Sequence, residues 1–113
     1  MKFNGWRSMW VMATFDLPTQ TTVQRKRYSN FRKMLLENGF TMMQFSVYVR
    51  NMPTQHKAEA LINRMGQLTP QEGQCAFIQI TDKQYGMIKN FYGHKEDKEK
   101  IPKKYEQLVL FGD

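Results

Sequence analysis

The sequence contains a single cysteine, Cys75, among 113 residues. One thiol excludes a disulfide within the chain, a CxxC redox pair and a zinc site built from several cysteines of one chain. This usage is typical of a reducing compartment, so we expect a cytoplasmic location. Histidine is also scarce, and His56 and His94 fall at a predicted helix start and in a charged stretch, where we expect surface roles.

Long hydrophobic runs are missing as well. The apolar run at 9–15 is too short to cross a bilayer, and it continues into Asp16 and Pro18 without a signal-peptide cleavage site. We therefore expect no membrane among the partners of this protein.

Acidic residues are scarce in the first part of the chain. The first 50 residues hold eight lysines and arginines but only two acids, Asp16 and Glu37, whereas the remaining 63 hold nine basic and eight acidic residues. The net charge of +7 and the pI near 9.7 favour a polyanionic partner such as nucleic acid. Acidic protein surfaces and anionic membranes attract the same charge.

Asp16 ends the run 9–15, which is predicted to be a buried strand. Because Asp16 precedes Leu17 and Pro18, ordinary turn chemistry explains it, and that is the favoured interpretation of this residue alone. The functional alternative is a metal site that handles a polyanion, since a lone carboxylate at a strand end would face a strongly basic helix.

That helix is predicted over 23–38, with Thr19 or Thr21 as its N-cap and Gly39 in the left-handed position after its end. Its predicted core face is the arc that contains the apolar residues Val23, Tyr28, Phe31, Met34 and Leu35.

Four basic residues lie on the two flanks of this helix, Arg25 and Arg32 on one and Lys26 and Lys33 on the other. A solvated face explains these flanks, and phosphate contacts are the functional alternative. Arg27 falls inside the apolar arc, where an unpaired charge is costly, so it must snorkel to water or find an anion. Asp16 is the expected partner of Arg27.

The rest of the chain alternates strands and helices. Residues 40–49 alternate in hydrophobicity and are predicted to be one extended stretch. A second helix opens at Thr54, a strand follows at 74–80, and 81–86 is a predicted turn. The predicted core stripe of the second helix is Ala58, Leu61, Ile62, Met65 and Leu68.

This order predicts a single two-layer α+β domain over 1–93. Residues 94–105 are a mixed-charge linker, and 106–113 return to the composition of a strand. A short strand beyond a charged linker needs a sheet edge, in this chain or in another.

Several motifs follow one another along the chain: the strand ending in Asp16, the step Arg25-Lys26-Arg27, the segment 44–48, the segment 81–84, the segment 91–93 and the apolar end 108–111. In this order they resemble the CRISPR-associated protein two family, a family of CRISPR-associated endoribonucleases and small spacer-acquisition subunits. The resemblance covers nearly the whole chain, and it is strongest to the versions found beside single-protein effectors.

The resemblance implies a ferredoxin-like βαββαβ sandwich in which 40–49 breaks into two strands. It also implies a symmetric homodimer in which an extra C-terminal strand joins the sheet of the partner protomer, through Leu108, Val109, Leu110 and Phe111. Asp16 of each chain would hold Mg²⁺ and would be the catalytic carboxylate. One carboxylate makes a poor Mg²⁺ site, whereas two that meet at a dimer axis make a plausible one.

The implied function is CRISPR adaptation, in which the homodimer bridges dimers of the CRISPR integrase subunit and holds double-stranded spacer DNA for insertion. We assign nucleic-acid binding to the basic residues Arg25, Lys26, Arg27, Arg32 and Lys33. Family members are also assigned metal-dependent endonuclease activity on RNA or DNA, which adds single-stranded RNA as a candidate ligand. Phe15 and Met42 stand where the family commonly has tyrosine and arginine.

Two alternatives belong to other functional classes. One is a stand-alone metal-dependent ribonuclease. The other is a non-catalytic RNA-binding domain, because 38–45 faintly resembles an aromatic RNA-binding strand. Of the two roles implied by the family, the scaffold is favoured over the enzyme.

Overall fold

A computed structural model describes residues 8–93 of the chain. It contains one four-stranded antiparallel sheet with the strand order β2-β3-β1-β4. The strands are β1 (Met9–Asp16), β2 (Thr41–Gln44), β3 (Val47–Met52) and β4 (Gln74–Thr81). The helices are α1 (Thr22–Glu37), α2 (Gln55–Gly66) and the short α3 (Asp82–Gly86). This order confirms the expected α+β fold with its βαββαβ sequence of elements.

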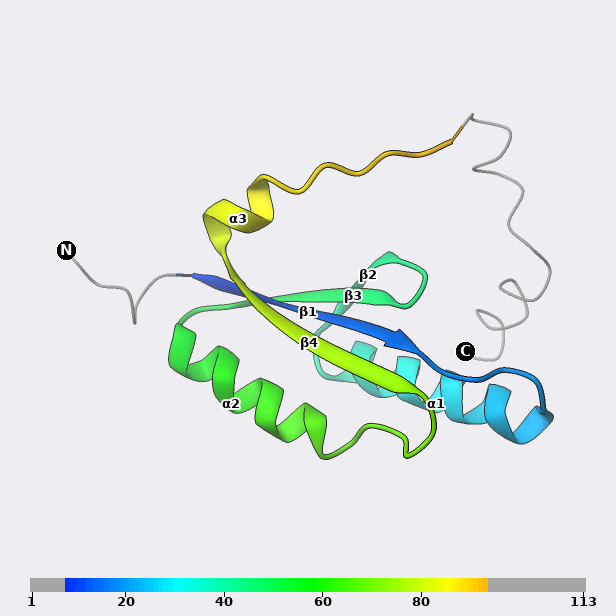
Figure 1. Cartoon of the computed structure of the whole chain (residues 1–113). Coiled ribbons are helices and arrows are strands. Elements are labelled where there is room, and N and C mark those ends of the chain that lie inside the picture. The colour runs from blue at the N-terminus through cyan, green and yellow to red at the C-terminus, as the bar shows by residue number, and fades with distance from the viewer. Residues whose placement is uncertain (1–7, 94–113) are drawn as a thin grey trace.

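The sheet has one covered and one largely uncovered face. Helices α1 and α2 lie together against one side of the sheet, and α3 lies on the other side at one end (Figure 1). Along β1 the side chains alternate, because successive residues of a strand point to opposite faces. Met9, Val11, Ala13 and Phe15 are buried under the helices, while Trp10, Met12, Thr14 and Asp16 point the other way.

The core lies between α1, α2 and the covered face. Val11, Ala13, Leu35, Ala58 and Met65 are completely buried in it. The expected core face of α1 is right for Tyr28, Phe31 and Leu35, which are buried, and Met34 packs partly against them. It is wrong for Val23, which is 60% exposed because it lies in the first turn of α1.

The ends of α1 follow the expected capping chemistry. Thr21 is the N-cap and accepts a hydrogen bond from the backbone of Gln24, whose side chain bonds back to the cap in a capping box. At the other end Gly39 has φ +84°, the left-handed conformation predicted for it.

Residues 40–49 contain a tight hairpin that their hydrophobic alternation did not predict. The chain turns at Phe45 and Ser46 between β2 and β3, as the family resemblance implied, and Ser46 has φ +63°. Because 40–49 contains no glycine or proline, its alternation runs unbroken through the turn, and the single extended stretch is wrong.

Two smaller expectations also change. Residues 82–86 form α3 rather than a simple turn, because Thr81 caps them and Gln84 completes a capping box. Leu68 lies beyond the end of α2 and is 51% exposed, so it does not belong to the core stripe.

In the part of the chain that the structure describes, no helix is long and apolar enough to cross a bilayer. The linker 94–105 and the C-terminal strand with Leu108, Val109, Leu110 and Phe111 lie outside the described residues.

Candidate functional site

Asp16 is the last residue of β1 and is exposed. The alternation of β1 places it on the uncovered face, in line with Trp10, Met12 and Thr14. Its cross-strand neighbour is Gln74, the first residue of β4. The carboxylate therefore stands at one end of an apolar sheet face rather than beside α1.

An open depression of about 670 Å³ surrounds this strand end. Its lining residues come from β1, the β2–β3 turn and the start of β4: Thr14, Phe15, Asp16, Ser46, Val47, Gly73, Gln74, Cys75 and Ala76. Asp16 supplies the only carboxylate in this lining. Burial raises the pKa of the Cys75 thiol to about 11, so this thiol stays protonated at neutral pH and is a poor nucleophile.

The β2–β3 turn is fixed to the end of β1 by Ser46. The Ser46 carbonyl accepts a hydrogen bond of 3.1 Å from the backbone N–H of Phe15. The Ser46 Oγ lies 2.9 Å from the Tyr28 hydroxyl on α1. The predicted extended stretch 40–49 ran straight through Ser46, and a serine with positive φ leaves no local signal that would have revealed this turn.

Gly73 closes the depression from the other side. It has φ +86°, and a Cβ at this position would lie 2.5 Å from the Asp16 carbonyl oxygen. Only glycine therefore allows the α2–β4 loop to approach the end of β1 so closely. A glycine immediately before a predicted strand was the available signal for this contact.

One chain holds too few ligands for a magnesium ion. Mg²⁺ prefers octahedral oxygen coordination through one or two carboxylates and several waters. Within residues 8–93 no three His, Cys, Asp or Glu side chains come together as a metal site. Asp16 therefore fits Mg²⁺ only where a second carboxylate is brought to it. The neutral polar residues Thr14, Ser46 and Gln74 line the same depression.

Arg27 does not pair with Asp16. Its guanidinium forms an ion pair with Glu72 in the α2–β4 loop, and both side chains are about half exposed. Asp16 lies on the other face of the sheet from α1, which is the geometric reason why the expected pair is absent. Arg27 is thus near the candidate nucleic-acid surface but already faces an acid.

The other basic residues of α1 differ in their burial and in the hydrogen bonds that they make within the chain. Arg25 is half-buried and donates to the carbonyls of Thr19 and Gln20, each at 3.3 Å. Arg32 hydrogen-bonds to Tyr48 beneath the helix, with its Nε and Nη1 atoms buried. Lys26 and Lys33, on the opposite flank, are exposed.

Burial of Tyr48 raises the pKa of its hydroxyl, and the positive charge of Arg32 acts in the opposite direction. Arg32 thus stabilises the packing of α1 on β3 in addition to lending its charge to the surface. His56, at the start of α2, is exposed, and His94 lies outside the described residues.

The fold and this site define a small α+β domain that carries a carboxylate at a strand end and a basic first helix. Residues 9–88 match the model of one protein family, described as CRISPR associated protein Cas2. The chain belongs to this Cas2 family.

Curated relatives support the assignment. The chain is 44% identical over 110 residues to a CRISPR-associated endoribonuclease Cas2 of Flavobacterium psychrophilum, a match that covers 97% of this chain and 94% of the relative. It is 48% identical over 103 residues to the protein of the same name from Parvibaculum lavamentivorans, covering 91% of this chain and 100% of the relative.

A solved structure shares the fold. The crystal structure of Streptococcus pyogenes Cas2 at pH 6.5 superposes with a TM-score of 0.57, covering 74% of this chain and 99% of that chain. The two sequences are only 20% identical, so this likeness concerns the fold alone.

Proposed function

We propose that this Cas2 protein is a homodimeric subunit of CRISPR adaptation that holds duplex DNA and bridges dimers of the CRISPR integrase subunit. The observation that carries the proposal is the position of Asp16 at the end of the uncovered sheet face. A surface that pairs two copies of this face would also pair their carboxylates.

The uncovered face has the chemistry of an interface. By strand register, Met12 of β1 lies between Val49 of β3, which is buried, and Ile78 of β4; Met12 is half-buried and Ile78 is 42% exposed. Contiguous apolar surface of this kind marks interaction sites on soluble proteins. Two sheets can pack face to face about 10 Å apart, and a twofold axis presents the same face from each copy.

Pairing the faces completes the proposed metal site. Two Asp16 carboxylates would supply the ligands for Mg²⁺ that one chain lacks. When bound, Mg²⁺ polarises a phosphate and activates water for phosphodiester cleavage. Gly73 and Ser46 fix the backbone at the end of β1, which carries the carboxylate, and the thiol of Cys75 stays outside the chemistry.

The basic side of α1 supports binding of duplex DNA through its phosphates. Lys26 and Lys33 are seven positions apart, which corresponds to roughly 10 Å along a helix. We expect these exposed lysines to make the main phosphate contacts. Arg25, Arg27 and Arg32 strengthen the positive field from positions where the chain already contacts them.

The C-terminal strand has a candidate docking edge. Among the described residues, β4 lies at an outer edge of the sheet and pairs only with β1. We propose that Leu108, Val109, Leu110 and Phe111 of one protomer join such an edge of the partner. Edge strands bind extended segments through backbone hydrogen bonds.

A second function, metal-dependent endonuclease activity on RNA or DNA, is favoured by Asp16 and by the relatives, which are named CRISPR-associated endoribonuclease Cas2. The substitution Asp16→Ala separates the two functions. It should abolish Mg²⁺-dependent cleavage while leaving spacer integration by the complete complex largely intact, because bridging needs the dimer and the basic surface rather than the metal.

Glu37→Ala is a matched control, because it removes one exposed carboxylate at the far end of α1. Circular dichroism and light scattering must first show that both variants remain folded and dimeric. Loss of integration together with cleavage in Asp16→Ala, but not in Glu37→Ala, would refute the scaffold role. Cleavage by the wild type without any contribution to integration would favour a stand-alone ribonuclease.

A further inference from the structure

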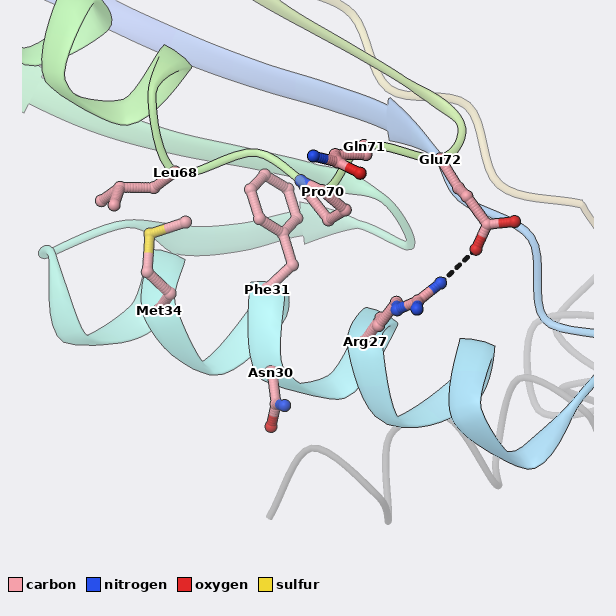
Figure 2. A pocket seen from close by; sticks show the side chains of 8 residues that line it. All are labelled: Arg27, Asn30, Phe31, Met34, Leu68, Pro70, Gln71 and Glu72. Atoms are coloured by element: carbon pink, nitrogen blue, oxygen red, sulfur yellow. Dashed lines mark hydrogen bonds and ion pairs between the residues drawn. The ribbon is translucent and has the colours of Figure 1, made fainter.

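A groove of about 710 Å³ lies between α1 and the loop that joins α2 to β4. Figure 2 shows that Phe31 and Met34 rise from α1 toward the loop, while Leu68 and Pro70 approach from the loop side. Gln71 extends along the rim above them, and Arg27 meets Glu72 at one end (Figure 2). The groove is separate from the depression around Asp16, with which it shares no lining residue.

The floor of this groove is apolar. Phe31 is a core residue and only 3% exposed, and Met34 is half-buried, so the exposed apolar surface of the groove belongs mainly to Leu68 on the rim, which is 51% exposed. An exposed leucine beside an aromatic residue and a proline loses hydrophobic stabilisation unless something covers it. A flat apolar group would fit on this floor.

The charge around the groove indicates the kind of group that enters it. Arg27 and Glu72 neutralise each other, and an ion pair between half-exposed side chains contributes little stability. A phosphate could therefore take the place of Glu72 beside Arg27. Lys26 and Lys33 lie on the outer flank of the same helix, and Asn30 lies between them and projects away from the loop (Figure 2).

We propose that this groove binds one unpaired nucleotide of a nucleic acid whose backbone follows Lys26 and Lys33. The base would pack over Leu68 and Pro70, Gln71 would hydrogen-bond to its edge, and Arg27 would exchange Glu72 for a phosphate. Sites for single-stranded nucleic acid combine a positively charged path for the backbone with side chains on which bases pack, usually aromatic ones. In this groove Leu68 and Pro70 would take the place of the aromatic platform. The basic flank favours this occupant over an acidic peptide, because it continues beyond the groove along α1.

The inference rests on the proposed binding of nucleic acid, and it narrows the ligand to one with an unpaired end. The probes are a blunt DNA duplex, the same duplex with a short single-stranded DNA overhang, and the same duplex with an RNA overhang, each measured by fluorescence anisotropy with the full chain. The wild type should bind an overhang probe about tenfold more tightly than the blunt probe, the scale expected from covering roughly 50 Å² of apolar surface. The overhang, DNA or RNA, that gives the larger increase in affinity over the blunt duplex identifies the nucleic acid that supplies the nucleotide.

Two variants test the groove itself. Leu68→Ser and Gln71→Ala change exposed rim residues, so both should fold, remove most of the preference for the overhang and leave blunt-duplex affinity unchanged. Gln67→Ala is the matched control, because Gln67 is an exposed residue of the same loop outside the groove lining. Glu72→Gln should strengthen overhang binding, since it frees Arg27 and removes a negative charge from the rim.

The outcomes separate this inference from the proposed function. Equal wild-type affinity for all probes overturns the nucleotide site and assigns the groove to a protein segment. Equal losses for blunt and overhang probes in Leu68→Ser and Gln71→Ala overturn it as well. Binding of the overhang without binding of the blunt duplex supports the groove but refutes the duplex scaffold, and binding of no probe refutes both.

Discussion

The two faces of the sheet are built from the same strands but perform different tasks. On β1, Val11 and Ala13 are completely buried under the helices, whereas Met12 between them points to the face that α1 and α2 leave open. The covered face supplies the stability of the domain. The uncovered face ends in Asp16, so the residues that we assign to association and metal binding lie on the side that contributes less to folding.

The covered face nevertheless controls the geometry of the site. Phe15, directly before Asp16, packs against three rings, with centroid distances of 5.5 Å to Tyr28, 5.0 Å to Phe31 and 5.7 Å to Tyr48. Phe15 points into the core, so the aromatic ring that precedes the aspartate belongs to the support of the strand rather than to the metal site. The aromatic cluster is what holds the strand end in place.

The largest effect is expected from Phe15→Ala. Truncating a buried aromatic residue leaves a cavity, so the free energy of unfolding should fall by about 3–5 kcal/mol. Urea unfolding followed by circular dichroism measures this loss. Met12→Ala on the opposite face is the control and should lower the free energy of unfolding of the isolated domain much less. Equal losses would mean that the two faces contribute equally to the stability of the domain.

The uncovered face is tested by Ile78→Glu. If two copies pack through this face, burying an unpaired carboxylate should weaken the dimer on the order of 100-fold, or about 2–3 kcal/mol. Light scattering across a concentration series measures the shift toward monomer. Gln67→Glu, which adds the same charge on the helix side, should leave the dimer intact. A dimer that persists in Ile78→Glu would place the interface elsewhere.

The junction of the two faces is tested by Gly73→Ala. Its Cβ would clash with the Asp16 carbonyl at 2.5 Å, and φ +86° is unfavourable for alanine, so stability should fall by roughly 1–3 kcal/mol. Any Mg²⁺-dependent cleavage should fall as well, because the end of β1 must shift. Gly66→Ala makes the same chemical change in α2, where nothing lies within 4 Å, and should be neutral or stabilising.

The smallest effect concerns the pH dependence of stability at the edge of the covered face. Burial raises the pKa of Cys75 from 9.0 to about 11. Below pH 9 the thiol keeps its proton in both the folded and the unfolded chain. Above pH 9 the unfolded chain loses this proton more readily than the folded chain does. The free energy of unfolding should therefore decline as the pH rises from 9 to 11.

Urea unfolding at pH 8 and pH 10 measures this dependence. Cys75→Ala should show a smaller decline than the wild type, while the contribution of Tyr48 remains in both proteins. Parallel declines in the two proteins would contradict a buried thiol at this edge.

Local patterns were sufficient to predict much of the fold. The 3.6-residue period and the caps placed α1 within one residue at each end, and the strand predicted at 74–80 is β4. Both depend on short-range chemistry, since capping and periodicity join residues only a few positions apart. The motif order that resembles the Cas2 family likewise led to the family that comparison establishes.

The contacts between distant segments could not be predicted in this way. Arg27 pairs with Glu72, which is 45 positions away, because the α2–β4 loop returns to α1 in the folded chain. The same loop brings Gly73 against Asp16 and leaves Leu68 on a groove instead of in the core. The hairpin at Ser46 depends on hydrogen bonds to Phe15 and Tyr28 rather than on a local turn signal.

The sequence by itself thus determined the helices α1 and α2, the strands β1 and β4, the basic character of α1 and the lone carboxylate, because these are properties of neighbouring residues. Only the tertiary structure decided which face Asp16 occupies, which acid Arg27 meets and how fully the chain engages Arg25 and Arg32. Those outcomes depend on packing two helices against one face of the sheet, which leaves the other face, and Asp16 at its end, open.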